Sequence, residues 1–311
     1  MDGNETEGSR LTWRHRLAGV TPSSTTIGML CGAGAALFWA AGFAAARHGI
    51  AIGYTPADLA VHRFAWAGIF LLPLLGPGGL RDFGGIGWRR ALLLTLVGGP
   101  PLAIISYSGF LLVPLGHGGV IQPSCAALFG LLYASAVLGE RLPRERIVGA
   151  AVIVLGLCVI GLEAISTIGR HGLLGDFAFV AAGACFATFA MLVRLWHIAP
   201  TRATAIVSVV SLADIPIHGA LFGFERMLSF GTWENVVQAL AQGALAGAGA
   251  IYLFARAVFL LGAARAAVFT SLVPGFTLLI GFGLLGEVPS LAQLAGLAIV
   301  LVGFRMTQRA G

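Results

Sequence analysis

Ten apolar runs, each long enough to cross a lipid bilayer, dominate the sequence and limit what the chain can fold into. A helix needs about 20 apolar residues to cross the hydrocarbon core. The predicted spans cover residues 25–46, 55–76, 91–113, 117–138, 144–162, 173–193, 201–223, 235–260, 263–285 and 290–307. Only 10% of the 311 residues are charged, too few to cover a soluble surface. The sequence therefore predicts an all-α membrane protein without a soluble catalytic domain. The short breaks at 114–118 and Gly262 leave nine spans as the alternative count.

Arginine residues are distributed unevenly between the two ends of the predicted spans. With the N-terminus inside the cell, Arg47, Arg170 and Arg226 lie in outer loops. Fourteen others lie in inner loops and tails: Arg10, Arg14, Arg16, Arg81, Arg89, Arg90, Arg141, Arg144, Arg146, Arg194, Arg202, Arg265, Arg305 and Arg309. Positive residues concentrate on the cytoplasmic side of membrane proteins. Both termini are therefore predicted to be cytoplasmic, with residues 1–24 as a retained tail rather than a signal peptide.

Several function classes are excluded by the residue types that the chain uses. All 19 basic residues are Arg, so a P-loop lysine and a Schiff-base lysine are excluded, and with them nucleotide hydrolysis by this chain. The four cysteines lie inside apolar runs without CxxC spacing, which predicts no disulfide, metal or cofactor. The net charge of +6 is spread too thinly to form a nucleic-acid surface. The expected partners are the lipid bilayer and a small-molecule substrate, and no enzymatic activity is predicted.

An internal repeat is the most informative feature of the sequence. The pattern GE-x8-G-x6-G occurs at Gly139-Glu140, Gly149 and Gly156, and again 147 residues later at Gly286-Glu287, Gly296 and Gly303. The same offset maps Gly28 onto Gly175 and Arg47 onto Arg194. Such self-similarity predicts two five-span repeats, at 25–162 and 175–307, joined by a linker at 163–174. Since five is odd, the repeats lie in opposite orientations around a central cavity, which is typical of secondary transporters.

The two motif segments also carry a family resemblance. LGERLPRERIVGAAVIVLG and LGEVPSLAQLAGLAIVLVG, at the junctions of the fourth and fifth and of the ninth and tenth spans, resemble the EamA branch of the drug/metabolite transporter superfamily. The resemblance covers roughly residues 25–307. Within the superfamily, the chain is most similar to the YddG-type amino acid exporters. The resemblance implies ten helices around a central cavity and export from the cytoplasm across the bacterial inner membrane.

Charged and titratable residues inside spans are candidates for a coupling or cavity role, because such groups are costly in lipid. These candidates are His62, Arg63, Asp214 and Arg256. Arg256 lies near the inner end of its span, so extension of its side chain to the headgroups is an equal alternative. His62 and Asp214 are the predicted carriers if a proton drives transport.

Aromatic and small polar residues within the spans are the candidates for substrate binding. They are Trp39, Phe43, Tyr107, Gln122, Ser124, Phe186, Tyr252 and Ser271. They recur on six spans to which the resemblance assigns the cavity, although a single aromatic residue is more often packed in the core or against lipid. Pro123 and Pro274 lie early in the fourth and ninth spans, where each removes a backbone hydrogen bond and makes a kink or hinge.

The predicted function is secondary export of small metabolites, most of all neutral amino acids including aromatic ones. Export of drugs or other metabolites is the alternative within the superfamily. Two alternatives from other classes are an ion channel, for which the sequence has no filter-like segment, and an intramembrane aspartyl protease. The protease would use Asp176 and Asp214 on successive spans, which are predicted to differ in depth by roughly 9 Å at 1.5 Å per residue.

Overall fold

The computed structural model describes residues 24–75, 79–83 and 85–309. Within this part of the chain, ten helical segments are long and apolar enough to cross a membrane, which confirms the all-α membrane fold. The first half contains α2 (Ser24–Ile52), α3 (Pro56–Leu71), η1 (Leu72–Leu75), α4 (Gly79–Asp82), α5 (Trp88–Gly98), α6 (Pro100–Gly109), α7 (Leu115–Ala136) and α8 (Arg144–Thr167).

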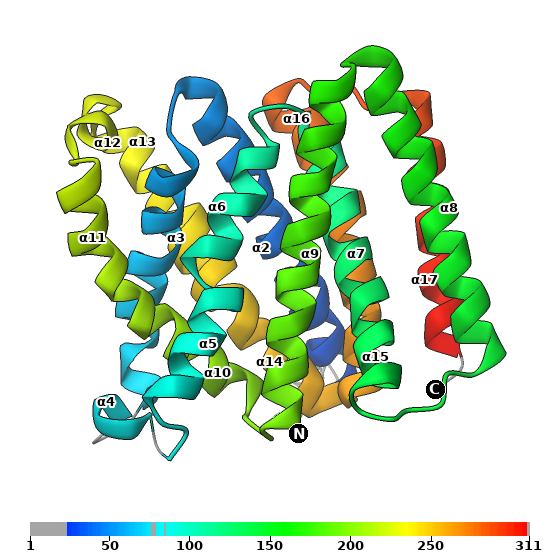
Figure 1. The fold of residues 1–311 in the computed structure, drawn as a ribbon, viewed down its shortest axis with the longest axis horizontal. Helices are drawn as coiled ribbons and strands as arrows, with labels where there is room; N and C mark the ends of the chain where they lie inside the picture. The colour runs from blue at the N-terminus through cyan, green and yellow to red at the C-terminus, as the bar shows by residue number, and fades with distance from the viewer. Residues whose placement is uncertain (1–23, 76–78, 84, 310–311) are drawn as a thin grey trace, which may run out of the picture.

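The second half also forms five spans, but these are divided into more helical pieces than the spans of the first half (Figure 1). It contains α9 (Arg170–Leu195), α10 (Pro200–Val210), η2 (Ser211–Ala213), α11 (Asp214–Leu221), α12 (Glu225–Ser229), α13 (Gly231–Gln238), η3 (Ala239–Gly249), α14 (Ala250–Leu261), α15 (Ala263–Ala267), η4 (Val268–Leu272), α16 (Val273–Leu285) and α17 (Leu291–Arg309). The segment 163–174, expected as a linker, consists mainly of the end of α8 and the start of α9, which are separated only by Ile168 and Gly169.

Several spans are built from more than one helical piece. The third span breaks at Gly99, directly before Pro100 and Pro101, because a residue that precedes proline disfavours the α conformation. The seventh span passes through a short 3-10 segment, η2, just before Asp214. The eighth span contains the π-helical segment η3, and π-helical turns frequently occur at functional sites.

The GE turns have the same geometry in the two halves, which supports the inverted repeat. Gly139 and Gly286 have φ angles of +68° and +67°, a left-handed conformation that favours glycine at a helix end. In each turn the glutamate N–H donates back to the carbonyl six residues earlier, Glu140 to Ala134 at 2.9 Å and Glu287 to Gly281 at 3.0 Å.

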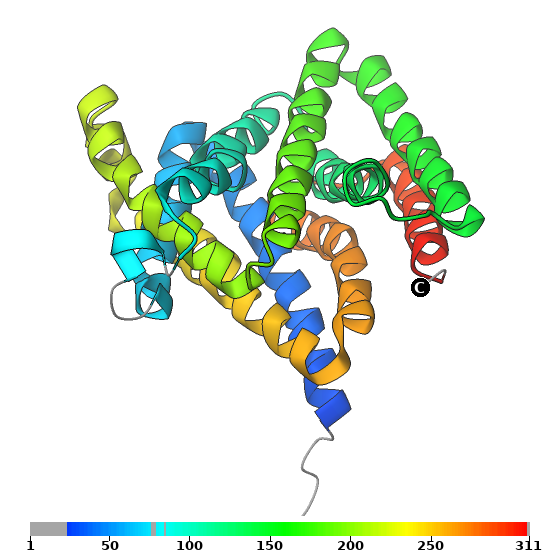
Figure 2. The ribbon, with the colours of Figure 1, turned by 60° about the horizontal axis from the view of Figure 1, so that its bottom comes forward.

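The paired glycines of the motif form the contact between α8 and α17, which we call the glycine seam. A Cβ atom on Gly149 would lie 2.8 Å from the Gly303 carbonyl oxygen, and one on Gly156 would lie 2.8 Å from that of Gly296. The reverse approaches are equally close, at 2.8 Å for Gly303 and 3.0 Å for Gly296. Each repeat thus contributes the same glycines to one two-fold contact, in which the backbones approach closely. The two helices lie side by side at the edge of the bundle (Figure 2).

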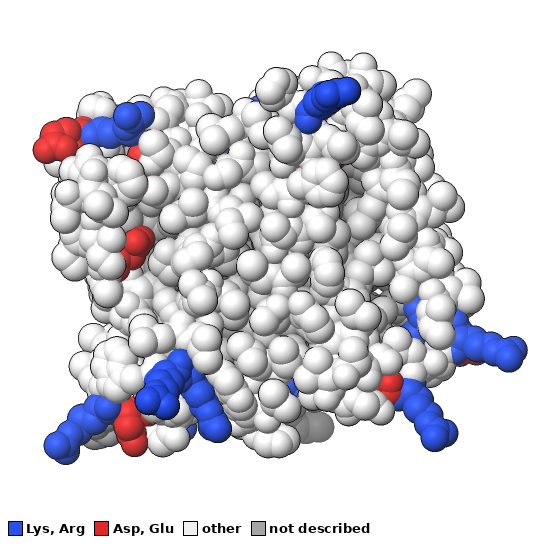
Figure 3. All heavy atoms as spheres, viewed as in Figure 1, with Lys and Arg blue, Asp and Glu red and all other residues white. Residues whose placement is uncertain are grey.

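Both ends of the described chain lie at one end of the bundle (Figure 1). On the face shown in Figure 3, most basic side chains gather at that same end, below a broad band whose charged atoms are confined to one acidic patch at its left side. We call this the inner end and the opposite one the outer end, after the topology predicted from the Arg distribution.

Candidate functional site: the outer closure

Arg47 and Glu287 form an ion pair at the outer end of the bundle, between the first span and the turn that follows the ninth. Arg47 Nε donates to Glu287 Oε1 at 2.7 Å, and both side chains are about one quarter exposed, at 26% and 24%. The second carboxylate oxygen, Oε2, accepts the N–H of Leu115 at 2.7 Å, where α7 begins. A carboxylate at a helix N-terminus is favoured by the helix dipole. Arg47 Nη1 donates to the Phe110 carbonyl oxygen at 3.0 Å, so backbone groups hold both charges.

A second ion pair occupies the corresponding place at the inner end. Arg194 donates through Nη2 to Glu140 Oε1. The 147-residue offset maps Arg47 onto Arg194 and Glu140 onto Glu287, so the two pairs correspond, and each joins one repeat to the other. The inner pair is more open than the outer pair, with 60% of the Arg194 side chain and 33% of the Glu140 side chain exposed.

Directly beneath the outer pair lies an aromatic layer made of Phe43, Phe110 and Phe179. The Phe43 and Phe110 ring centroids are 6.2 Å apart in an edge-on arrangement, and those of Phe110 and Phe179 are 4.9 Å apart. Phe110 and Phe179 are fully buried. The layer joins the first span to the sixth through contacts between aromatic rings.

The three phenylalanines of this layer are not repeated at the corresponding positions of the other repeat. At the positions related by the offset, the chain has Ala190, Ala257 and Gly32. The two ends of the bundle therefore share the GE turn and the ion pair. They differ at the three positions of the aromatic layer, where the outer end has phenylalanines and the inner end has small residues.

A third layer, one turn further inward, is a hydrogen-bond chain through Tyr107, Gln242 and Gly42. The Tyr107 hydroxyl donates to Gln242 Oε1 at 3.0 Å, and Gln242 Nε2 donates to the Gly42 carbonyl oxygen at 3.0 Å. A Cβ atom on Gly42 would lie 3.7 Å from Arg63 Nη1, so the Arg63 guanidinium borders this chain. All three layers bring together helices of both repeats, and we call them together the outer closure.

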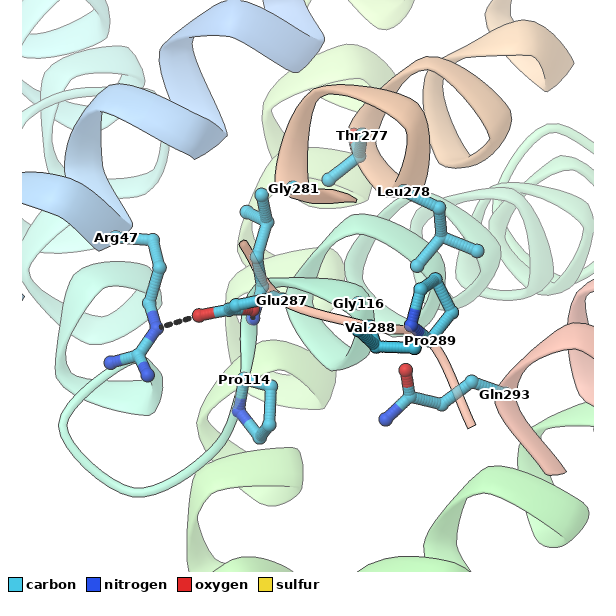
Figure 4. A pocket seen from close by; sticks show the side chains of 11 residues that line it. Arg47, Pro114, Gly116, Thr277, Leu278, Gly281, Glu287, Val288, Pro289 and Gln293 are labelled. Atoms are coloured by element: carbon cyan, nitrogen blue, oxygen red, sulfur yellow. Dashed lines mark hydrogen bonds and ion pairs between the residues drawn. The ribbon is translucent and has the colours of Figure 1, made fainter. Parts of the chain in front are cut away.

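A small pocket opens beside the outer ion pair (Figure 4). Its volume is about 210 Å³, and its charged lining groups are Arg47 and Glu287. The other lining residues are Pro114, Leu115, Gly116, Thr277, Leu278, Gly281, Val288, Pro289 and Gln293. The pocket therefore presents one cation, one anion and an otherwise mainly apolar wall.

The predicted substrate-binding residues are spread over several environments. Phe43 and Tyr107 belong to the outer closure, and Trp39 lies one turn inward of Phe43 on α2, with its ring 5.5 Å from that of Phe254. Gln122 Oε1 accepts a hydrogen bond from Ser106 at 2.5 Å, which joins α6 to α7. Trp39 and Gln122 are half-buried.

The two predicted serines donate to carbonyls of their own helical segments. The fully buried Ser124 hydroxyl donates to Val120 O at 2.6 Å, and that of Ser271 donates to Val268 O at 2.6 Å. Phe186 and Tyr252 are exposed on the surfaces of α9 and α14. Arg256 is exposed on the same helix as Tyr252, with its guanidinium 5.7 Å from the Phe259 ring centroid.

The two prolines predicted as hinges occupy different local structures. Pro123 lies inside the continuous helix α7. Pro274 lies in the first turn of α16, directly after the 3-10 segment η4, where its missing N–H costs little. Asp214 opens α11 after the break at η2 and is half-buried.

A buried cluster of one histidine and two carboxylates lies near the outer end, and the sequence analysis did not find it. His117 Nδ1 lies 2.8 Å from Asp176 Oδ1, and His117 Nε2 lies 4.0 Å from Glu163 Oε2. Gln293 Nε2 donates to Glu163 Oε1 at 3.4 Å. The cluster joins α7, α8, α9 and α17. Asp176 is thus paired with a histidine of α7 rather than with Asp214.

A second, largely buried group contains His62 and three residues that sequence reasoning did not identify. His218 Nε2 lies 3.1 Å from Asp58 Oδ1, and both side chains are almost fully buried. His62, one turn after Asp58 on α3, interacts through Nε2 with Asn235 Oδ1 at 3.1 Å. His62 therefore lies in a polar group that links the second, seventh and eighth spans.

Comparisons with known proteins agree with this architecture. The model of the EamA-like transporter family matches residues 26–162 and 173–308, one match for each repeat. A protein of Streptantibioticus cattleyicolor described as a probable terminal-alkyne amino-acid exporter is 27% identical over 278 residues, which cover 87% of this chain and 90% of that protein. A solved crystal structure that is 19% identical, with a TM-score of 0.59, covers 91% of this chain and 96% of its own and shows the same fold.

Ten apolar spans in two inverted repeats, with a matching ion pair at each end, are the architecture of a membrane transporter. The chain belongs to the EamA-like transporter family of the drug/metabolite transporter superfamily, because the family model matches nearly its whole length.

Proposed function

We propose that the chain exports neutral amino acids, including aromatic ones, from the bacterial cytoplasm across the inner membrane by alternating access to a cavity between the repeats. Both termini are cytoplasmic in this proposal. The observation that carries it is the correspondence of the ion pairs Arg47–Glu287 and Arg194–Glu140, one at each end and each joining the two repeats.

Alternating access requires that one end of the pathway closes while the other opens. The outer end has the aromatic layer and the hydrogen-bond chain behind its ion pair, whereas the inner pair is more exposed and has small residues at the positions related to the aromatic layer. This difference supports an inward-facing arrangement, in which substrate enters from the cytoplasm. Rocking of one repeat against the other would break the outer layers and release the substrate outside.

The chemistry of the residues predicted to line the cavity supports an amino acid with an apolar side chain. Trp39 and Tyr107 combine an aromatic wall with one polar group each, and an aromatic face attracts an ammonium group. Extra methylenes in such a pocket change affinity by only about 1 to 3 kcal/mol, so we expect broad selectivity among aliphatic and aromatic substrates. The related protein described as a probable terminal-alkyne amino-acid exporter favours this class over drugs and other metabolites.

The energy source in this proposal is either the substrate gradient or an ion gradient, because the chain has no lysine for nucleotide binding. His62 and Asp214 are our candidate proton carriers. If protons drive export through them, replacing His62 by Gln and Asp214 by Asn makes flux insensitive to an imposed pH gradient. Flux of the double variant that still follows the pH gradient would exclude both residues as coupling sites.

Counterflow with purified protein in liposomes tests the function directly. Vesicles loaded with unlabelled leucine or phenylalanine should accumulate the same labelled amino acid. Vesicles loaded with an unlabelled sugar or nucleotide should not accumulate the same labelled sugar or nucleotide. Tyr107→Ala and Trp39→Ala should each lower this flux per molecule of folded protein in the membrane. Accumulation of sugars or nucleotides without any amino acid would overturn the substrate class while leaving the fold intact.

A further inference from the structure

The pocket at the outer ion pair has the size and charge of a binding site for one small zwitterion. Its volume of about 210 Å³ is below the range of about 300 to 1,000 Å³ that is typical of sites for drug-sized ligands. Arg47 and Glu287 both line it, and their side chains are partly exposed to it. Figure 4 shows the two charged groups meeting at its wall, with Gln293 across the pocket.

An α-amino acid carries a carboxylate and an ammonium group on one carbon atom, so it can replace each partner of this ion pair at once. Its carboxylate would bind the Arg47 guanidinium and its ammonium would bind Glu287. Arg47 and Glu287 then each keep an opposite charge as a partner. A ligand with only one charged group would leave either Arg47 or Glu287 without compensation in a partly buried place, which is costly.

The two charges remain positioned when they separate, because each has a second partner in the backbone. Arg47 keeps the Phe110 carbonyl oxygen, and Glu287 keeps the N–H of Leu115. These contacts fix both side chains in the free protein, so little ordering of Arg47 or Glu287 is needed when a ligand binds.

We propose that this pocket is an exit site for the zwitterionic head of the exported amino acid, with the carboxylate on Arg47 and the ammonium on Glu287. By the repeat, the inner pair Arg194–Glu140 offers the same two charges to a substrate that arrives from the inside. At each end, the substrate replaces the contact between the arginine and the glutamate. That end of the bundle therefore opens only when a zwitterion is bound to the two charges. This inference rests on the proposed amino acid substrate and assigns the residues that recognise its head group.

Competition at the outer face tests the site. Labelled leucine counterflow is measured in vesicles with the outer face outward, against unlabelled leucine, leucinamide, which lacks the carboxylate, and 4-methylpentanoate, which lacks the ammonium. Wild type should favour leucine over either analogue by about tenfold or more, equivalent to one good charged contact. Arg47→Gln should remove the preference over leucinamide only, and Glu287→Gln should remove the preference over 4-methylpentanoate only.

Matched variants separate recognition from a purely structural ion pair. Arg47→Lys keeps the positive charge and should keep the preference over leucinamide, although lysine lacks the planar group of N–H donors of a guanidinium. Arg194→Gln and Glu140→Gln should leave outer-face competition unchanged and alter the same ratios at the inner face. If Arg47→Gln and Glu287→Gln leave both preference ratios unchanged, whatever their transport rates, the ion pair only holds the outer end closed and does not recognise the substrate.

The outcomes also separate this inference from the proposed function. If wild type moves sugars or nucleotides but no amino acid, both the proposed function and this inference fail. If wild type moves leucine and the variants leave the preference ratios unchanged, only this inference fails.

Discussion

Tyr107 of the first repeat and Gln242 of the second are joined by a hydrogen bond of 3.0 Å from the phenol to the amide oxygen. Because Gln242 also donates to the Gly42 carbonyl oxygen, one amide links three helices behind the outer ion pair. Tyr107 and Gln242 are both buried. The contact therefore contributes both to stability and to closure of the outer end.

Tyr107→Phe should destabilise the protein, because it leaves the buried Gln242 Oε1 without its donor. The expected cost is about 1 to 3 kcal/mol, measured as the shift in thermal unfolding of the detergent-purified protein. Tyr252→Phe is the matched control, because the Tyr252 side chain is exposed and the same change there should be nearly neutral. Equal shifts in the two variants would show that the Tyr107 hydrogen bond does not matter for stability.

Gly156→Ala should loosen the glycine seam between α8 and α17. The added methyl would lie 2.8 Å from the Gly296 carbonyl oxygen, where the backbone cannot easily yield. We expect a loss of about 1 to 3 kcal/mol from overpacking. Gly161→Ala, on the same helix with open space around its Cβ position, should be neutral or stabilising by up to about 1 kcal/mol. Similar unfolding temperatures for both variants would contradict the assigned contact.

His117→Gln should destabilise the outer ends of α7, α8 and α9, because Asp176 Oδ1 then loses the ring nitrogen that lies 2.8 Å away. Leaving a buried polar group without its hydrogen-bond partner costs about 1 to 3 kcal/mol. Adding Asp176→Asn in the same chain should recover part of the loss, because a neutral amide is less costly to bury than a carboxylate that has lost its partner. A double variant that is as unstable as the sum of the single changes would show that His117 and Asp176 do not interact.

The topology predicts which single cysteines can be labelled from outside whole cells. In a background without the four native cysteines, Cys at position 170 should react with a membrane-impermeant thiol reagent, whereas Cys at positions 81 and 144 should react only after permeabilisation. All three native side chains are exposed in the fold, so access across the membrane decides the outcome. Labelling at 81 with protection at 170 would reverse the assignment of inner and outer ends.

The fold could be predicted from the sequence because its two main signals are local. A run of about 20 apolar residues identifies a span without knowledge of its neighbours, and the repeated glycines mark the same turn and the same packed helix in each half. The predicted helix ends were less accurate, because the run of apolar residues can stop before the helix itself ends. Arg47 was expected in an outer loop after a span that ended at residue 46, but α2 continues to Ile52.

The polar contacts could not be predicted, because they join residues far apart in the sequence. His117, Glu163 and Asp176 lie on three helices, and spans that are apolar all round give little indication of which face turns inward. One signal was present: Arg47 and Arg194, and Glu140 and Glu287, correspond under the same 147-residue offset. Matching charges in both repeats could have suggested the two ion pairs.

The glycine seam is equivalent to the interface of a symmetric dimer whose two subunits have been fused into one polypeptide. In a true homodimer, every substitution at such an interface occurs twice, so its two ends must remain identical. Fusion removes that constraint. Ile160 and Thr307 correspond under the repeat, yet one is a fully buried apolar residue near the outer end and the other carries a hydroxyl near the inner end. The chain can therefore adapt each end of the seam to its own side of the membrane.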